Sequence, residues 1–233
     1  MLQHLREQVL EANLELVRKG LVLFTFGNAS GISREEGLVV IKPSGVPYED
    51  MKSEHLVVTD MTGKVVEGKL RPSSDLPTHL VLYEAFPEIG GIAHTHSEYA
   101  TSWAQARKPI PCFGTTHADY FHGPVPVTSE MTDEEIAGDY EKNTGHAIVR
   151  CLQRHGAGTT PGVLVANHGP FAWGKDAASA AHNAVILEAV ARMAYFTLGI
   201  NAAAQPVGRG LHDKHYLRKH GAAAYYGQPK DSK

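Results

Sequence analysis

Residues 90–100 have the sequence GGIAHTHSEYA, an apolar β-prone run that ends in two histidines separated by one residue. Successive side chains of a strand point to opposite faces, so His94 and His96 are expected to share one face, with Thr95 turned away. Two imidazoles held in this way can bind one metal ion, or they can belong to an ordinary polar surface. The eleven residues alone leave both interpretations open.

The segments on either side of this strand have helical spacing. Ser74 is a suitable N-cap for the stretch DLPTHLVLYEAF at 75–86, and SEYATSWAQAR at 97–107 follows the strand directly. Closer to the N-terminus, Leu5, Val9, Ala12 and Leu16 predict an amphipathic helix. We therefore expect helices to cover the strand that carries the histidines.

Short β-prone runs indicate that a sheet surrounds this strand. They are LVLFTFGNASGI at 21–32, GLVVIKPSG at 37–45 and HLVVTD at 55–60, with a hairpin expected at Thr62-Gly63. Two further strands around a polar turn are predicted in PGVLVANHGPFAWG at 161–174. The expected fold is a single layered α/β domain over residues 1–233, with a central, largely antiparallel sheet flanked by helices.

Two later helices and the tail complete this expectation. A long helix is predicted after a Thr132 cap, interrupted near Gly145, and residues 176–199 predict a helix that is apolar over most of its surface and central to the core. The tail, about 205–233, is basic, aromatic and poor in aliphatic residues. Alone it would bury little, so we expect it to pack against another subunit.

Composition narrows the class of ligand and the compartment. The chain has 233 residues, 42% of them hydrophobic, and a net charge of -3, which gives no reason to expect nucleic acid or a membrane as partner. No apolar run approaches the roughly 20 residues of a membrane span, and the start lacks a secretory core, so we expect a cytoplasmic protein with a small ligand. Cys112 and Cys151 are far apart in the sequence, so a metal would need nitrogen and oxygen ligands.

Other residues could join the histidine pair or form a second kind of site. His168 follows the apolar run GVLVAN, where a third imidazole could reach the same ion. The loops TFGNAS, KPSG and RPSSD combine small residues with hydrogen-bond donors, and Lys42 could supply charge for an anion. The same residues also serve as turns and caps. GKVVEGKL has Leu70 where a P-loop requires Ser or Thr, which excludes a triphosphate site of that type.

Seven motifs in order resemble the pentose-phosphate epimerases of the class II aldolase family, nearly from end to end. They are FTFGNAS, IKPSG, PSSDLPTH, GGIAHTHSEYA, GTTHADYF, PGVLVANHGPFAWG and DKHYLRKHGAAAYYGQ. The resemblance implies a homotetramer whose active sites lie between subunits and are completed by a neighbour's tail. It implies a divalent metal, zinc or else manganese or cobalt, held by His94, His96, His168 and Asp75. It implies substrate and phosphate contacts from Gly27, Asn28, Lys42, Ser44, Gly45, Ser73, Ser74 and His215, and an acid/base pair of Asp119 and Tyr226.

The activity that this resemblance implies is interconversion of L-ribulose 5-phosphate and D-xylulose 5-phosphate. The hydrogen on C4 is not adjacent to the C2 ketone, so cleavage of C3–C4 and re-addition is the expected route, with the metal as Lewis acid. The nearest alternative is a sugar-phosphate aldolase of the L-fuculose-1-phosphate type, which carries Glu where this chain has Asp75. A silent metal-binding or assembly module would be expected to have lost Asp119 and Tyr226.

Overall fold

One seven-stranded sheet forms the centre of the computed structural model, which describes residues 2–155, 160–222, 224 and 225. The strand order is β4-β3-β2-β1-β5-β7-β6, and every neighbouring pair is antiparallel. This confirms the expected sheet. The strands are β1 (Asn28–Ser33), β2 (Leu38–Ile41), β3 (Val57–Asp60), β4 (Val65–Glu67), β5 (Gly91–His94), β6 (Gly162–Leu164) and β7 (Pro170–Gly174).

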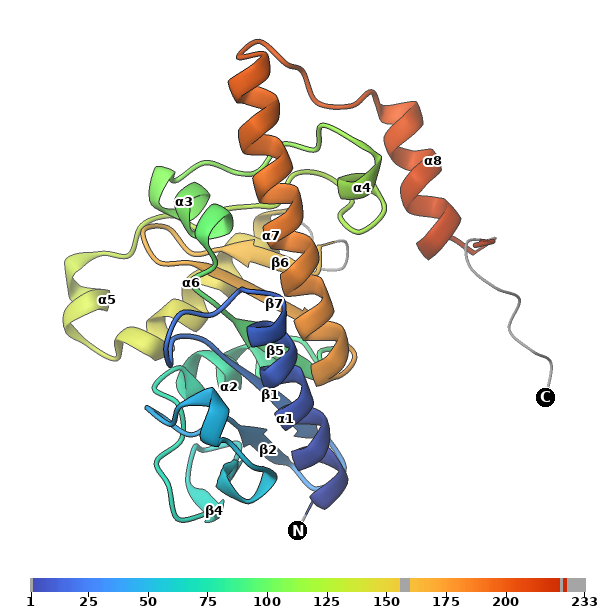
Figure 1. Cartoon of the computed structure of the whole chain (residues 1–233). Helices are drawn as coiled ribbons and strands as arrows, with labels where there is room; N and C mark the ends of the chain where they lie inside the picture. Colours follow the sequence, from blue (N-terminus) through green and yellow to red (C-terminus); the bar gives the residue numbers. More distant parts are fainter. Residues whose placement is uncertain (1, 156–159, 223, 226–233) are drawn as a thin grey trace.

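Helices cover both faces of the sheet (Figure 1). α1 (Gln3–Arg18) and α7 (Ala177–Ile200) pack on one face, and α2 (Leu76–Ala85) and α6 (Tyr140–His155) pack on the other. The remaining helices lie around this three-layer body. They are η1 (Tyr48–Asp50), η2 (Ser53–His55), α3 (Glu98–Ala106), α4 (Thr115–Ala118), α5 (Asp133–Ala137) and α8 (Arg209–His220).

Alternation along the central strands separates the two hydrophobic layers. In β5, Ala93 faces the α1/α7 layer and Ile92 faces the α2/α6 layer; in β7, Ala172 and Phe171 divide in the same way. The small side chains on the first face let α7 approach the sheet closely with its own alanines, Ala177, Ala180, Ala181 and Ala184. This packing holds the ends of β5 and β7 in place relative to α7.

By length and composition alone, α7 is apolar enough to cross a membrane, so the expectation that no run has this character was wrong. Its first half packs on the sheet through buried alanines, and Leu187 and Val190 join a third cluster with α3. Core helices of soluble proteins pass the same test of length and hydropathy. The expectation of a helix central to the core is confirmed for this part of α7.

The helix break after Thr132 lies earlier than expected. Thr132 does cap α5, in a capping box with Glu135, but the chain leaves the helical conformation at Gly138 and α6 then runs unbroken through Gly145. At Gly145 an added Cβ would lie 2.8 Å from Cβ of Val81 in α2. This glycine is therefore a contact between two helices rather than an interruption.

Two other local expectations were wrong. Asp75, not Ser74, is the N-cap of α2, and its side chain makes no capping hydrogen bond because it accepts one from Asn28 instead. The β-prone run that starts at Leu21 becomes a strand only at Asn28. The residues before it form a loop that starts at the buried Leu21 and in which Phe24 has a left-handed backbone (φ 54°) and a side chain that is 86% exposed.

We predict that Gly91→Ala destabilises the protein by about 1–3 kcal/mol, the usual range for overpacking. The added methyl would lie 2.4 Å from backbone atoms of Asp176 and Ala177 at the start of α7. Urea unfolding followed by circular dichroism measures the change. Gly199→Ala, near the end of α7, is the matched control because it lies in open space, and it should be neutral or stabilising by up to about 1 kcal/mol. Equal stabilities of the two variants would contradict the prediction.

Candidate metal centre

Three imidazoles meet at one end of the sheet. His94 is the last residue of β5, His96 follows just beyond the strand, and His168 lies in the turn between β6 and β7. Because β7 pairs with β5, this turn lies beside the end of β5. The ring centroids of the three histidines are 4.8–5.1 Å apart. Asn167, with φ 61°, supplies the left-handed residue of the turn that presents His168.

The nitrogen atoms of these rings fit a divalent metal. Nδ1 of His94 lies 2.9 Å from the carbonyl oxygen of Pro170, which accepts its proton and leaves the Nε2 lone pair free. That Nε2 lies 3.1 Å from Nε2 of His96, close to the spacing of about 3.4 Å expected between tetrahedral ligands about 2.1 Å from zinc. Burial lowers the pKa of His96 and lowers that of His168 to about 3, so both rings are neutral at pH 7, as ligands must be.

Asp75 lies at the same cavity. Nδ2 of Asn28 donates to its Oδ2 at 2.7 Å. Burial acts to raise the pKa of Asp75, but the nearby imidazoles, first among them His94, and the Asn28 hydrogen bond outweigh it, and the pKa lies below its ordinary value. The carboxylate is therefore an anion beside the imidazoles, and it can serve as a further oxygen ligand.

A cavity of about 380 Å³ opens in front of these groups. The three loops that combine small residues with donors converge on it, and the loops at 42–45 and 71–75 are tied together through their backbones. The Ser44 amide donates to the Arg71 carbonyl oxygen, and the Ser73 amide donates to that of Lys42. The sequence-predicted loop residues at the cavity are Gly27, Asn28, Lys42, Ser44, Gly45, Ser73 and Ser74.

Lys42 is a buried cation at this cavity, with only 2% of its surface exposed. Its Nζ lies 3.3 Å from the carbonyl oxygen of its neighbour Pro43 and 4.6 Å from the centre of the Tyr48 ring, and the described residues give it no carboxylate partner. Burial lowers the pKa of Lys42 to about 8. An anionic ligand group in the cavity would favour the charged form.

Several cavity residues were not foreseen from the sequence. Phe26 stacks on His96 with ring centroids 6.0 Å apart, and Tyr140 and Glu141 reach the cavity from the first turn of α6. The aromatic residue beside the Gly27-Asn28 turn was a usable signal for Phe26. Tyr140 and Glu141 could be found only by placing the helix break at Gly138.

Asp119 and His215 lie elsewhere in the described chain and do not line this cavity. Asp119 follows α4 and accepts a bidentate pair of hydrogen bonds from Arg218 at 3.1 and 2.9 Å, while Nδ1 of His215 lies 3.1 Å from its Oδ1. Lys219 is 3.9 Å from the same carboxylate. Tyr226, the other member of the expected acid/base pair, lies outside the described residues.

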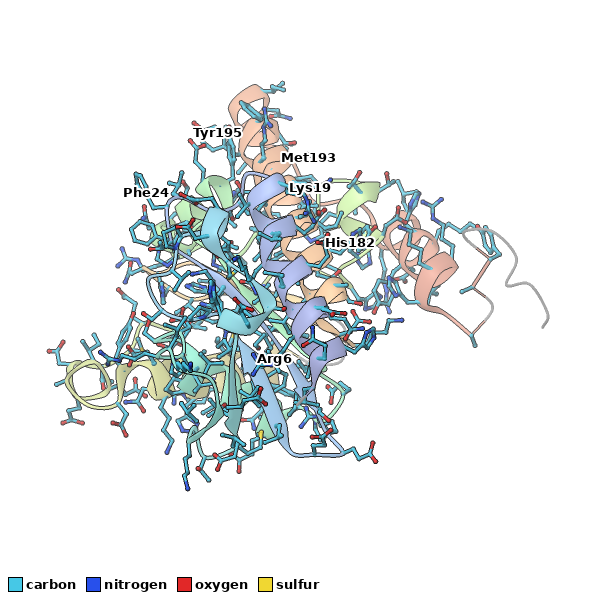
Figure 2. All side chains as sticks on the ribbon, turned by 60° about the horizontal axis from the view of Figure 1, so that its bottom comes forward. Arg6, Lys19, Phe24, His182, Met193 and Tyr195 are labelled. Atoms are coloured by element: carbon cyan, nitrogen blue, oxygen red, sulfur yellow. The ribbon has the colours of Figure 1, made fainter. Side chains whose placement is uncertain are left out.

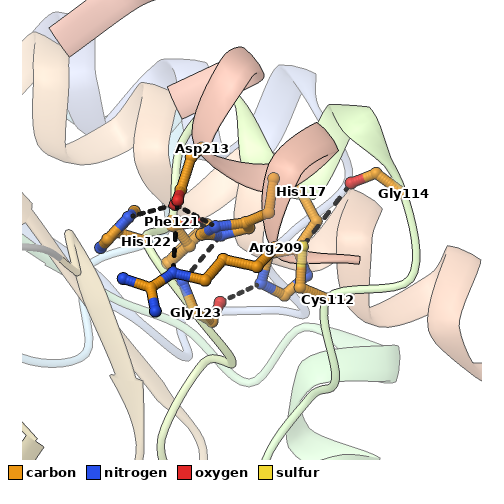
Figure 3. Close-up of polar contacts among 9 residues, drawn as sticks. Cys112, Gly114, His117, Phe121, His122, Gly123, Arg209 and Asp213 are labelled. Carbon is orange, nitrogen blue, oxygen red and sulfur yellow. Dashed lines mark hydrogen bonds and ion pairs between the residues drawn. The ribbon is translucent and has the colours of Figure 1, made fainter. Parts of the chain in front are cut away.

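A second group of possible ligands anchors α8 to the segment after α4 (Figure 3). Oδ1 of Asp213 lies 3.1 Å from Nε2 of His122 and 3.4 Å from Nδ1 of His212. Nε2 of His212 lies 3.0 Å from the amide nitrogen of Gly123 and 3.2 Å from the carbonyl oxygen of Phe121. These hydrogen bonds account for the cluster without an ion.

The antiparallel sheet between helical layers, with three imidazoles at the end of its central strands, is the architecture of a class II aldolase. Residues 7–195 match the family described as the Class II Aldolase and Adducin N-terminal domain, and the chain belongs to this family. Within this family, the chain is similar in sequence to an epimerase. The chain is 58% identical to L-ribulose-5-phosphate 4-epimerase UlaF of Salmonella paratyphi B, over 97% of this chain and 100% of the relative.

Solved structures of aldolases have the same fold. An L-fuculose 1-phosphate aldolase superposes with a TM-score of 0.78 at 27% identity, covering 92% of this chain and 95% of that one. The l-fuculose-1-phosphate aldolase of Thermus thermophilus superposes with a TM-score of 0.67 at 19% identity, covering 87% and 98%. The second similarity concerns the fold alone.

We predict that Asp119→Asn loosens α8, which buries none of its residues and is held largely by polar contacts. Hydrogen exchange of the α8 amides at pH 7 should be faster than in the wild type. Burial acts to raise the pKa of Asp119, but hydrogen bonds from Arg218 and His215 outweigh it and the pKa is lowered from 3.8. The stabilisation is therefore complete above pH 3.8 and is lost as the pH falls through the lower folded-state pKa.

The exposed carboxylate of Asp139 provides the control, because Asp139→Asn changes the same functional group away from α8. This variant should exchange like the wild type. The difference between Asp119→Asn and the wild type should disappear in acid. Equal protection of α8 at pH 7 in all three proteins would show that the carboxylate does not hold the helix.

Proposed function

We propose that this chain interconverts L-ribulose 5-phosphate and D-xylulose 5-phosphate by cleaving and re-forming the C3–C4 bond. The observation that carries the proposal is the 58% identity, over the whole length of the relative, to an L-ribulose-5-phosphate 4-epimerase. The cavity supports it chemically, because it combines three convergent imidazoles, a carboxylate and a buried cation. Those groups suit a phosphorylated sugar with adjacent oxygen atoms.

The proposed metal ligands are His94, His96 and His168, with Asp75 as a further oxygen ligand. When bound, the divalent ion supplies Lewis-acid stabilisation of the negative charge that C3–C4 cleavage leaves on the C2–C3 fragment. Among ions that accept imidazole and carboxylate ligands, we propose zinc as the native one, with manganese and cobalt as alternatives. Because the pKa values of His96 and His168 are lowered, the lone pairs of these two rings are available to a metal at pH 7.

The phosphate and the departing aldehyde are assigned to the three loops at the cavity. Lys42 supplies a positive charge without a competing carboxylate among the described residues, and the Ser44-Gly45 and Ser73-Ser74 segments offer hydroxyl and amide donors. Gly27 and Asn28 contribute donors beside Asp75. Holding the phosphate keeps the aldehyde fragment in place while it turns to present its other face, which epimerisation requires.

Proton transfer is assigned to Asp119 and Tyr226, with His215 assisting. Substrate and product carry the C4 oxygen on opposite sides, so two proton carriers are needed. Because Asp119 and His215 lie apart from the cavity of their own chain, we propose that a second copy supplies them, in a homotetramer with intersubunit active sites. In this arrangement residues 1–233 form one domain whose tail, about 205–233, contacts the neighbour.

Exposed apolar side chains support such an assembly. On the outer part of α7, Met193 is 51% and Tyr195 is 58% exposed, and both project from the body in Figure 2. On α8, Leu211 and Leu217 are also half exposed. Surfaces of this kind are typical of contacts between subunits. The family consists of soluble enzymes, and we propose that this one acts in the cytoplasm in pentose catabolism, on arabinose or a related sugar.

A second candidate function is that of an L-fuculose-1-phosphate aldolase, which would release the two fragments. The fold similarity to such an aldolase, with a TM-score of 0.78, favours this alternative. The shorter Asp75 argues against it, because the resemblance to the aldolase predicts Glu at this position. The much higher identity to epimerases points in the same direction.

We predict that the purified, metal-loaded protein converts L-ribulose 5-phosphate to D-xylulose 5-phosphate. Product analysis by NMR or by coupled assay measures the conversion. Release of glycolaldehyde phosphate without formation of xylulose 5-phosphate would instead support the aldolase. L-Fuculose 1-phosphate offered under the same conditions is the control substrate and should remain uncleaved.

We predict that His96→Asn lowers bound metal well below one ion per chain and leaves the fold intact. Removal of one of three imidazoles leaves an incomplete ligand set, and His96 lies beyond the end of β5, so the sheet does not depend on it. Elemental analysis after dialysis measures the metal. His4→Asn, at an exposed histidine of α1 remote from the cavity, is the control. Equal metal content in both variants would exclude His96 as a ligand.

A further inference from the structure

A buried row of three polar side chains lies behind the candidate metal centre and has no part in the proposed reaction. Oγ of Ser30, in β1, lies 2.7 Å from Nδ1 of His79 and 2.8 Å from the hydroxyl oxygen of Tyr83, both in α2. All three residues are fully buried. Nε2 of His79 has no hydrogen-bond partner among the described residues. A buried polar atom in this condition normally has a partner, so its surroundings need an explanation.

The direction of the hydrogen bonds follows from counting protons. The Tyr83 hydroxyl carries one proton, and the nearest acceptor in this row is Oγ of Ser30. Ser30 then donates its own proton to Nδ1 of His79, and the neutral ring carries its proton on Nε2. The reverse direction would leave the Tyr83 proton without an acceptor in the row. Burial lowers the pKa of His79 to about 3, which agrees with a neutral ring.

His79 itself lies close to the candidate metal ligands. His79 lies one helical turn after Asp75, and its amide donates to the carbonyl oxygen of Asp75 at 3.1 Å. Residues four apart lie on the same side of a helix. Burial is the larger effect on the pKa of His79, and the negative charge of Asp75 acts against it. The ring of Phe171 lies 6.2 Å from His79 on one side and stacks on His94 at 4.1 Å on the other.

We propose that His79 is a positioning residue for the metal centre. Its Nε2–H, oriented by Ser30 and Tyr83, holds the carboxylate of Asp75 through one bridging water, because no described atom is a hydrogen-bond partner of Nε2. Asn28 already donates to Oδ2 of Asp75, so two donors from different elements would fix the plane of this carboxylate. Carboxylates that ligate metals are usually hydrogen-bonded in this way, and loss of such partners typically weakens binding about 10–100-fold.

Two substitutions of His79 distinguish the contributions of its two ring nitrogen atoms. In His79→Asn the amide lies near the former Nδ1 and keeps the contact with Ser30, but nothing remains at Nε2. In His79→Gln the longer side chain returns an amide donor close to the former Nε2. Tyr83→Phe removes the hydroxyl at the far end of the row and leaves Ser30 free to donate to His79. Its effect on metal affinity should therefore be much smaller than that of His79→Asn.

The measurement is titration of the metal-free full chain with Co²⁺, followed through the visible absorption of the bound ion. We expect His79→Asn to bind Co²⁺ about 10–100-fold more weakly, with a changed spectrum, and His79→Gln to recover most of the affinity and the wild-type spectrum. Circular dichroism and urea unfolding establish that each variant is folded. The spectrum reports ligand geometry, which a purely packing role would leave unchanged.

The inference rests on the proposed metal centre, and the outcomes keep the two apart. If the wild type binds no Co²⁺, the metal centre of the proposed function fails. If the wild type binds Co²⁺ and His79→Asn matches it in affinity and spectrum, the positioning role is overturned. Equal weakening in His79→Asn and His79→Gln with unchanged spectra would likewise overturn it, because His79 would then act through packing alone.

Discussion

The antiparallel pairing of β5 with β1 on one side and β7 on the other is the constraint on which the candidate site depends. His94 is opposite Asn28 in the first pair and opposite Phe171 in the second. A slip of one residue in either register would turn His94 toward α1 and α7, away from the cavity. Because β7 returns directly from the turn that holds His168, the same ladder also brings the third imidazole to the first two. Packing of small residues against α7 keeps that register.

Burial controls the electrostatics of the cavity. Burial lowers the pKa of His168 and of His96, so these rings are neutral at pH 7, whereas the half-buried carboxylate of Asp75 stays charged because polar groups surround it. Lys42 is the opposite case, a buried cation whose described neighbours are a carbonyl oxygen and an aromatic ring. A site that keeps these charges out of water favours a ligand that can satisfy both, an anionic phosphate at one end and oxygen atoms near the rings at the other.

Sequence reasoning succeeded where a local pattern decides the structure. The strand at 91–94, the sheet around it and the Thr132 cap follow from alternation and capping rules. It failed where tertiary contacts decide. Gly145 stays helical because Val81 packs against it, and Asp75 takes the N-cap position because Asn28 holds its side chain. The meeting of three distant loops at one cavity was expected only from family resemblance, since spacing along the chain carries no information about it.

α8 lies beyond the end of α7, apart from the sheet, and this placement has a genetic consequence. The imidazoles belong to the end of the sheet, whereas Asp119 follows α4 and its basic partners lie on α8, and the two groups do not share a cavity within one chain. In an assembly with intersubunit sites, a subunit that lacks one of the imidazoles still offers an intact Asp119 and α8 to its neighbour. A chain altered at the imidazoles and a chain altered at Asp119 or α8 would each be inactive alone. Assembled together they can form some intact sites, so mutations in the two regions would complement each other.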